Sequence, residues 1–159
     1  MRIFEWLQSR TSAKRGAVPE VPEAGPQPLP TPLSDLMARV QEQPSDEAWD
    51  AFHSAFLDSP LGVIASGFAP GASGTGRGSV RLARGATPDG RVMVLACADR
   101  DAFAQKFHDR FNQEVLGREL ARVAIAMPGC EGILVNSAAS FHSIAIDRAQ
   151  LTTLLQRRF

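Results

Sequence analysis

The stretch GILVNSAASFHSIAIDRAQLTTLL, residues 132–155, contains two strand patterns and one helix pattern in direct succession. Residues 132–135 are apolar and predict a buried strand, and residues 141–146 predict its partner across a short turn. Asp147 and Gln150 have the spacing of a capping box, which predicts the start of a final helix. That helix is expected to bury Leu151, Leu154 and Leu155. A strand pair followed by a capped helix indicates a domain of mixed α and β type.

Two helices are predicted between residues 33 and 60. The first ends at Pro44, and Ser45 is a candidate N-cap of the second. Pro60 ends the second helix, because proline cannot continue the hydrogen-bond ladder. The apolar stripes expected to be buried are Leu33, Leu36, Met37 and Val40 in the first helix, and Trp49, Phe52, Phe56 and Leu57 in the second.

Further strands are expected at residues 61–65, 79–83 and 91–96. The turn sequence TPDG, residues 87–90, predicts that the last two form a hairpin. Asp99 can cap a third helix, and a fourth is predicted over residues 114–127. Their apolar stripes are Phe103, Phe107 and Phe111 in the third helix, and Leu116, Leu120, Val123 and Met127 in the fourth.

Charge and composition narrow the classes of function. The 159 residues include 17 Lys plus Arg and 17 Asp plus Glu, which leaves no net field to attract nucleic acid, so nucleic-acid binding is not expected. No stretch approaches the roughly 18 apolar residues of a membrane span, and residues 1–7 do not resemble a signal peptide, so we predict a cytoplasmic location. Cys97 and Cys130 lie in apolar surroundings, which favours buried free thiols over the alternative of a disulfide.

The chain divides into three parts. Residues 16–32, GAVPEVPEAGPQPLPTP, predict a Pro-rich linker between a short amphipathic segment, residues 1–15, and a folded domain, residues 33–159. Phe4 and Trp6 are candidate partner-binding residues of the first segment. Alternatively they pack back onto the domain, or the segment touches a membrane surface.

Two further groups are candidates for contact with a partner. Gly74, Thr75 and Arg77 belong to a glycine-rich loop, residues 67–78, which lacks the Gly-Lys-Ser/Thr sequence of a P-loop, so we do not expect it to bind phosphate. Arg110, Arg118 and Arg122 form the other group, because the last two share one helical face and could meet an acidic partner. The alternative is that they belong to a solvated helix face.

Catalytic and metal sites were sought around His53, His108 and His142. The three histidines are scattered and no cysteine is close by in sequence, so no metal site and no cofactor is predicted. His142 could form a hydrolytic triad with Ser140 or Ser143 and an aspartate. The sequence has no Gly-x-Ser-x-Gly elbow, however, so we predict no catalytic residue.

The order of elements over residues 46–155 resembles the N-terminal domain of the SseB family, bacterial proteins named for enhanced serine sensitivity. The residues that carry the resemblance are FLDS 56–59, the Asp89-Gly90 turn, Ala98-Asp99 and GILVN 132–136. The chain departs from the family pattern at Cys97-Ala98 and at Ser137-Ala138. The resemblance implies an α+β fold that serves as a protein-interaction module, with no established cofactor and no catalytic residue to carry over.

We therefore predict an α+β fold: one domain in which a small, mainly antiparallel or mixed sheet packs against four to five helices, preceded by a Pro-rich tail. The predicted function is that of a non-enzymatic protein-binding or regulatory module of a bacterial cytoplasmic protein, with its contact surface on the rims of the sheet. One alternative is an immunity or accessory protein of a bacterial secretion system. A second alternative is a small hydrolase with a histidine-containing site.

Overall fold

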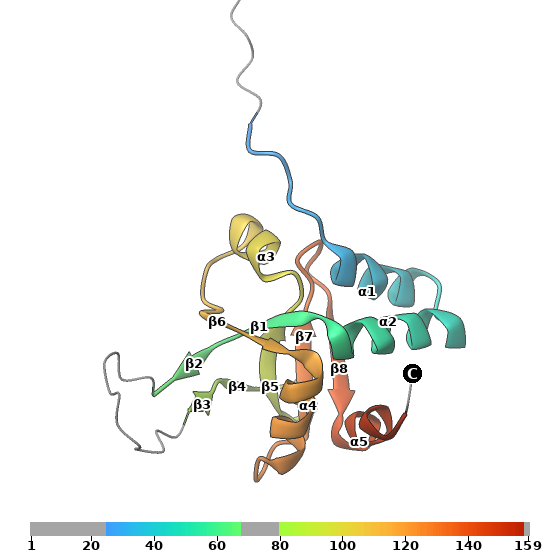
Figure 1. Ribbon diagram of the computed structural model, residues 1–159, viewed down its shortest axis with the longest axis vertical. Helices are drawn as coiled ribbons and strands as arrows, with labels where there is room; N and C mark the ends of the chain where they lie inside the picture. Colours follow the sequence, from blue (N-terminus) through green and yellow to red (C-terminus); the bar gives the residue numbers. More distant parts are fainter. Residues whose placement is uncertain (1–24, 68–79, 158–159) are drawn as a thin grey trace, which may run out of the picture.

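A mixed β-sheet organises the computed structural model, which describes residues 25–67 and 80–157 (Figure 1). The sheet has six strands in the order β6-β1-β5-β7-β8, and β4 also pairs with β5. Their bounds are β1 Pro60–Val63, β4 Arg84–Ala86, β5 Val92–Cys97, β6 Gln113–Leu116, β7 Gly132–Asn136 and β8 Ser143–Asp147. A separate two-stranded sheet consists of β2 Ala65–Ser66 and β3 Arg81–Leu82.

Five helices accompany these strands in the described residues. They are α1 Pro32–Glu42, α2 Asp46–Asp58, α3 Arg100–Lys106, α4 Gly117–Ala126 and α5 Arg148–Gln156. Within the six-stranded sheet β5 and β7 pair in parallel, whereas the other pairings are antiparallel. The α+β fold with a mixed sheet and five helices confirms the predicted fold class.

The two faces of the sheet are covered differently. Alternate residues of a strand point to opposite faces, so Val94 and Ala96 of β5 join the large core, to which α1, α2, α4 and α5 contribute. Leu95 and Cys97 belong to a smaller cluster with Phe103 of α3. Figure 1 shows α3 apart from the other helices, at the same end of the sheet as the turn between β7 and β8.

Several local predictions are confirmed. The Ser45 Oγ accepts a hydrogen bond from the Ala48 N–H at 3.1 Å and caps α2. Asp147 and Gln150 form both hydrogen bonds of the capping box at the start of α5. The turn at residues 87–90 joins β4 and β5 as a hairpin, with Gly90 at φ +84°. Cys97 and Cys130 are free and buried.

The predicted fourth helix is wrong over its first residues. Residues 113–116 form β6 because their main chain pairs antiparallel with β1, a non-local contact that the helical spacing does not reveal. The helix begins only at Gly117. Leu116 and Val123, which we expected in the core, have 51% and 44% of their surface exposed.

The third helix is shorter than predicted and is not capped as predicted. It ends at Lys106, so Phe111 lies beyond it. Asp99 precedes the helix, but it caps α1 instead: its carboxylate accepts hydrogen bonds from the N–H groups of Leu33, at 3.3 Å, and Ser34, at 2.8 Å. Asp99 adopts the left-handed conformation, with φ +48°, and its side chain makes no capping hydrogen bond to α3.

Three strand predictions also need correction. The strand expected at residues 61–65 is divided between β1 and β2, and residues 81–82 pair with β2 instead of forming the hairpin with β5. The hairpin partner of β5 is β4. The last strand begins at Ser143, because the turn after β7 extends through residues 137–142.

No helix of residues 25–67 and 80–157 is both long enough and apolar enough to span a membrane.

Candidate functional site

A cleft of about 410 Å³ lies at the carboxyl end of the parallel strands β5 and β7, between α3 and the β7–β8 turn. Ligands of open α/β sheets commonly bind beyond the carboxyl ends of parallel strands. The apolar wall consists of Ile64, Leu95, Phe103, Phe107, Phe111 and Phe141. The polar lining consists of His108, Arg110, Asn136, Ser137, Ser140, His142 and Ser143. We call this site the aromatic cleft.

The chain after α3 folds back to build the aromatic wall. The ring centroids of Phe103 and Phe111 lie 5.1 Å apart at an interplanar angle of 85°, an edge-to-face contact. Phe107, at the end of α3, touches Phe103 on one side and Phe141 of the β7–β8 turn on the other. The Arg100 Nε donates to the Phe111 carbonyl at 2.5 Å and fixes this return of the chain.

The β7–β8 turn is held from two sides. The Ala138 N–H donates to the Ser34 Oγ of α1 at 2.8 Å, and the Lys106 Nζ of α3 donates to the Ala139 carbonyl. Within the strands the Asn136 Nδ2 donates to the Ala96 carbonyl at 3.1 Å. Because Asp99 in turn holds the start of α1, the elements around the cleft form one hydrogen-bonded frame.

Two groups at the cleft lack the contacts that such groups usually have. The Phe141 side chain is 94% exposed, although its ring lies 5.1 Å from that of Phe107. The Ser140 Oγ is buried and has no hydrogen-bond partner among the described residues. A buried hydroxyl without a partner costs about 1–3 kcal/mol. Of the two, the exposed Phe141 ring is the apolar surface that a partner can reach.

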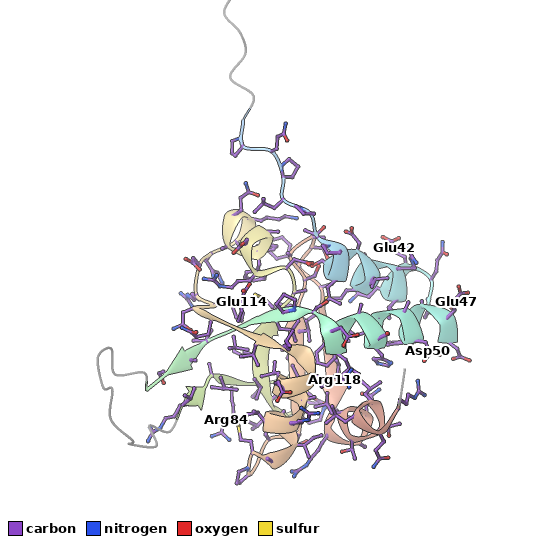
Figure 2. The ribbon with its side chains drawn as sticks, in the orientation of Figure 1. Glu42, Glu47, Asp50, Arg84, Glu114 and Arg118 are labelled. Carbon is purple, nitrogen blue, oxygen red and sulfur yellow. The ribbon has the colours of Figure 1, made fainter. Side chains whose placement is uncertain are left out.

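The charge at the aromatic cleft is one-sided. Arg110 lines it and makes no ion pair with any described residue, and none of its lining residues is a carboxylate. The neighbouring Asp109 is not part of the lining and lies 3.6 Å from Arg100, an arginine that also pairs with Asp101 at 3.5 Å. Figure 2 labels Glu42 and Glu47 near the α1–α2 turn and Asp50 further along α2, whereas Glu114 is labelled on the side of the molecule that carries α3.

A second cleft, of about 660 Å³, lies between α2 and α5 and contains His53. Burial lowers the pKa of His53, with a further contribution from Arg157 and an opposing one from Asp50. Two of the three carboxylates that line this cleft have partners: Asp50 pairs with Arg157 at 2.8 Å, and Asp147 caps α5. We therefore interpret this cleft as a polar contact region between α2 and α5.

The two clefts separate the groups that the hydrolase alternative requires. His142 and three serines line the aromatic cleft, but no carboxylate does. His53 lies with carboxylates in the second cleft, whose lining includes neither serine nor cysteine. Among residues 25–67 and 80–157, no group of three or more His, Cys, Asp or Glu side chains is arranged to hold a metal ion.

The residues predicted to bind a partner have different outcomes. Phe4, Trp6, Gly74, Thr75 and Arg77 lie outside the described residues. Two others, on α4, are paired: Arg118 with Asp58 of α2 at 3.2 Å, and Arg122 with Glu119 one turn earlier. Neither arginine of α4 lines the aromatic cleft, and Figure 2 shows Arg118 beside α2.

Sequence reasoning missed the exposure of Phe141 and the position of Arg110 in the aromatic cleft. It assigned Phe141 to a strand, where a phenylalanine is expected to be buried, and it did not place Arg110 near the phenylalanines. The sequence signal that could have pointed to this site is the succession of Phe103, Phe107 and Phe111. A helix as short as α3 cannot bury three aromatic side chains by itself. No family model, curated protein or solved structure matches this chain, so the resemblance to the SseB family remains a prediction.

Proposed function

We propose that this protein is a non-enzymatic binding module, part of a bacterial cytoplasmic protein, and that the aromatic cleft is where a partner protein docks. The observation that carries the proposal is Phe141, whose side chain is 94% exposed at the mouth of a cleft walled by other phenylalanines. Burial of a phenylalanine side chain contributes about 1.5–3 kcal/mol. A partner that covers Phe141 gains this contribution.

The composition of the cleft supports binding more than catalysis. Aromatic residues and arginine are the residue types that most often dominate the energy of protein interfaces, and both line this cleft. A hydrolytic triad needs a carboxylate to orient its histidine, and the residues that line the cleft with His142 supply none. The resemblance to SseB-family proteins also favours an interaction module.

The frame around the cleft favours a surface that is formed before the partner arrives. Ala138 and Ala139 of the turn are hydrogen-bonded to Ser34 of α1 and Lys106 of α3 respectively. A surface that is already ordered loses less conformational entropy on association, which raises affinity for a given contact area.

Affinity capture from the native host tests the proposal. The immobilised chain is compared with a Phe141→Ala variant and with Val123→Ala, which removes an exposed apolar side chain of α4 away from the cleft. The partner identified by mass spectrometry is then purified and its Kd is measured by isothermal titration calorimetry. We expect Phe141→Ala to raise the Kd by about tenfold or more, the effect of losing an interface anchor, and Val123→Ala to leave it unchanged.

Two outcomes would contradict the proposal. Equal affinity of the Phe141→Ala variant and the unaltered chain for the purified partner would place the contact surface elsewhere. Hydrolysis of a p-nitrophenyl ester that is lost on Ser140→Ala and on His142→Ala would favour the hydrolase alternative.

A further inference from the structure

The aromatic cleft combines an apolar recess with uncompensated positive charge. Its volume, about 410 Å³, falls in the range of pockets that enclose a small ligand or a large side chain. The rings of Phe103 and Phe111 meet edge to face, and those of Phe103 and Phe107 meet at a tilt of 44°, so this wall can accept a further ring. The recess therefore fits an apolar, preferably aromatic, anchor side chain.

Arg110 lines this recess, and Lys106, which is not part of the lining, contacts the ring of Phe107. Arg110 makes no ion pair with any described residue, and the Lys106 Nζ lies 5.4 Å from the centroid of the Phe107 ring. A guanidinium presents a planar fork of donors that matches a carboxylate, and an imidazole in its neutral form still offers one N–H. His108 and His142 thus add donors on either side. No carboxylate lines the cleft, so a carboxylate that pairs with Arg110 there comes from the partner.

We propose that the aromatic cleft recognises an acidic peptide segment of a partner protein, in which an apolar anchor side chain stands next to one or more carboxylates. The inference rests on the proposed binding function and adds the chemistry of the partner. The anchor enters the recess against Phe103 and Phe107, and the flanking carboxylate meets Arg110. Phe141, which projects beyond the recess, covers the backbone of the segment, a contact that a free small acid does not offer.

Selection from a phage-displayed library of random peptides tests this inference on the full chain. The expected enriched peptides carry an aromatic residue within about two positions of an aspartate or glutamate. A parallel selection on Arg110→Glu reverses the charge at the rim, and we expect its enriched peptides to carry lysine or arginine beside the same aromatic anchor. Arg110 is exposed, so its substitution leaves folding intact, and a circular dichroism spectrum verifies this.

One enriched peptide is then synthesised with a fluorescent label, and its Kd is measured by anisotropy. Replacement of its acidic residues by the matching amides, or Arg110→Ala in the chain, is expected to weaken binding about tenfold, as for loss of one charge-assisted hydrogen bond. Arg122→Ala, on α4 and away from the cleft, is the matched control and is expected to leave the Kd unchanged.

The outcomes separate this inference from the proposed function. Enrichment of anchors without acidic neighbours, or identical selections on the chain and on Arg110→Glu, would refute the acidic segment, whereas partner capture that depends on Phe141 would still stand. Displacement of the labelled peptide by a peptide of residues 1–10 at equal or lower concentration would instead assign the cleft to the chain's own Phe4 and Trp6. Displacement by adenosine monophosphate would assign it to a nucleotide.

Discussion

Asp99 joins two parts of the chain through a single side chain. Its carboxylate accepts from the N–H groups of Leu33 and Ser34, and its backbone has φ +48°. Loss of an N-cap costs about 1 kcal/mol, and an alanine in the left-handed conformation costs roughly 1–2 kcal/mol more. We therefore expect Asp99→Ala to lower the free energy of unfolding by about 2–3 kcal/mol, measured by urea denaturation followed by circular dichroism.

Two other substitutions at this position separate the cap from the backbone conformation. Asp99→Asn keeps an acceptor oxygen and tolerates a positive φ, so its free energy of unfolding should stay close to that of the unaltered chain. Asp99→Gly adopts a positive φ without strain but has no acceptor oxygen. Its free energy of unfolding should therefore lie between those of Asp99→Asn and Asp99→Ala. If Asp99→Asn is as destabilised as Asp99→Ala, the hydrogen bonds to α1 are not what the residue contributes.

The Cys97 thiol makes the stability of the protein depend on pH in the alkaline range. Burial raises the pKa of Cys97 from 9.0 to about 12. Between these two pH values the thiol stays protonated in the folded chain and ionises in the unfolded chain. This contribution to stability is complete below pH 9 and is lost as the pH rises towards 12. Because the chain contains no tyrosine, tyrosine ionisation adds nothing in this window.

Urea denaturation between pH 8 and pH 11 measures this decline. We expect the free energy of unfolding to decrease above pH 9, and to decrease less steeply in Cys97→Ala, which lacks the titrating group. Cys130 and the lysines remain in both proteins, so the difference between the two slopes isolates Cys97. Equal slopes would mean that its thiol ionises alike in the folded and unfolded chains.

At the scale of elements, the junction of β6 and α4 depends on one glycine. A Cβ atom added at Gly117 would lie 1.8 Å from the Phe56 carbonyl oxygen of α2, and this contact cannot be relieved by rotation of a side chain. Gly117→Ala must therefore push α2 and α4 apart, and we expect a loss of about 3 kcal/mol in the free energy of unfolding. Gly25→Ala, where nothing lies within 4 Å, is the matched control. A Gly117→Ala variant as stable as Gly25→Ala would show that the two helices are not packed this closely.

Elements with local signals could be predicted, and those fixed by distant contacts could not. The caps of α2 and α5 and the turn after β4 depend on residues a few positions apart, which a sequence shows directly. The strand β6 exists because it pairs with β1, whose residues lie far earlier in the chain: Gln113 pairs with Val63, and Leu116 pairs with Pro60. Its spacing of Leu116 and Leu120 is equally compatible with a helix, so the sequence alone favoured the wrong element.

The candidate site was harder to predict than the fold for the same reason. Phe103, Phe141 and Arg110 meet only because the chain folds back after α3 and because the β7–β8 turn reaches across to it. The sequence does contain three of the four phenylalanines of the wall, Phe103, Phe107 and Phe111, in steps of four. It does not show that the helix ends at Lys106. Because of this early end, Phe107 and Phe111 lie beyond the helix and line the cleft.

At the scale of the whole molecule, the sheet separates two apolar clusters of unequal size. The larger contains residues of α1, α2, α4 and α5, whereas the smaller centres on Phe103 and gathers few buried residues. Regions with fewer buried apolar contacts open at lower free energy, often without unfolding of the rest. We expect amide hydrogens of residues 100–111 to exchange before those of α4 and β7, measured by mass spectrometry of peptic fragments.

The variant Phe103→Ala sharpens this expectation, because Phe103 contacts both Phe107 and Phe111 at the centre of the smaller cluster. It should speed exchange in residues 100–111 and leave exchange in α4 close to that of the unaltered chain, since the sheet lies between them. A uniform increase across both regions would show that the clusters unfold as one unit. Separate opening would let the cleft side of the sheet adjust to a partner while the four-helix side keeps the fold intact.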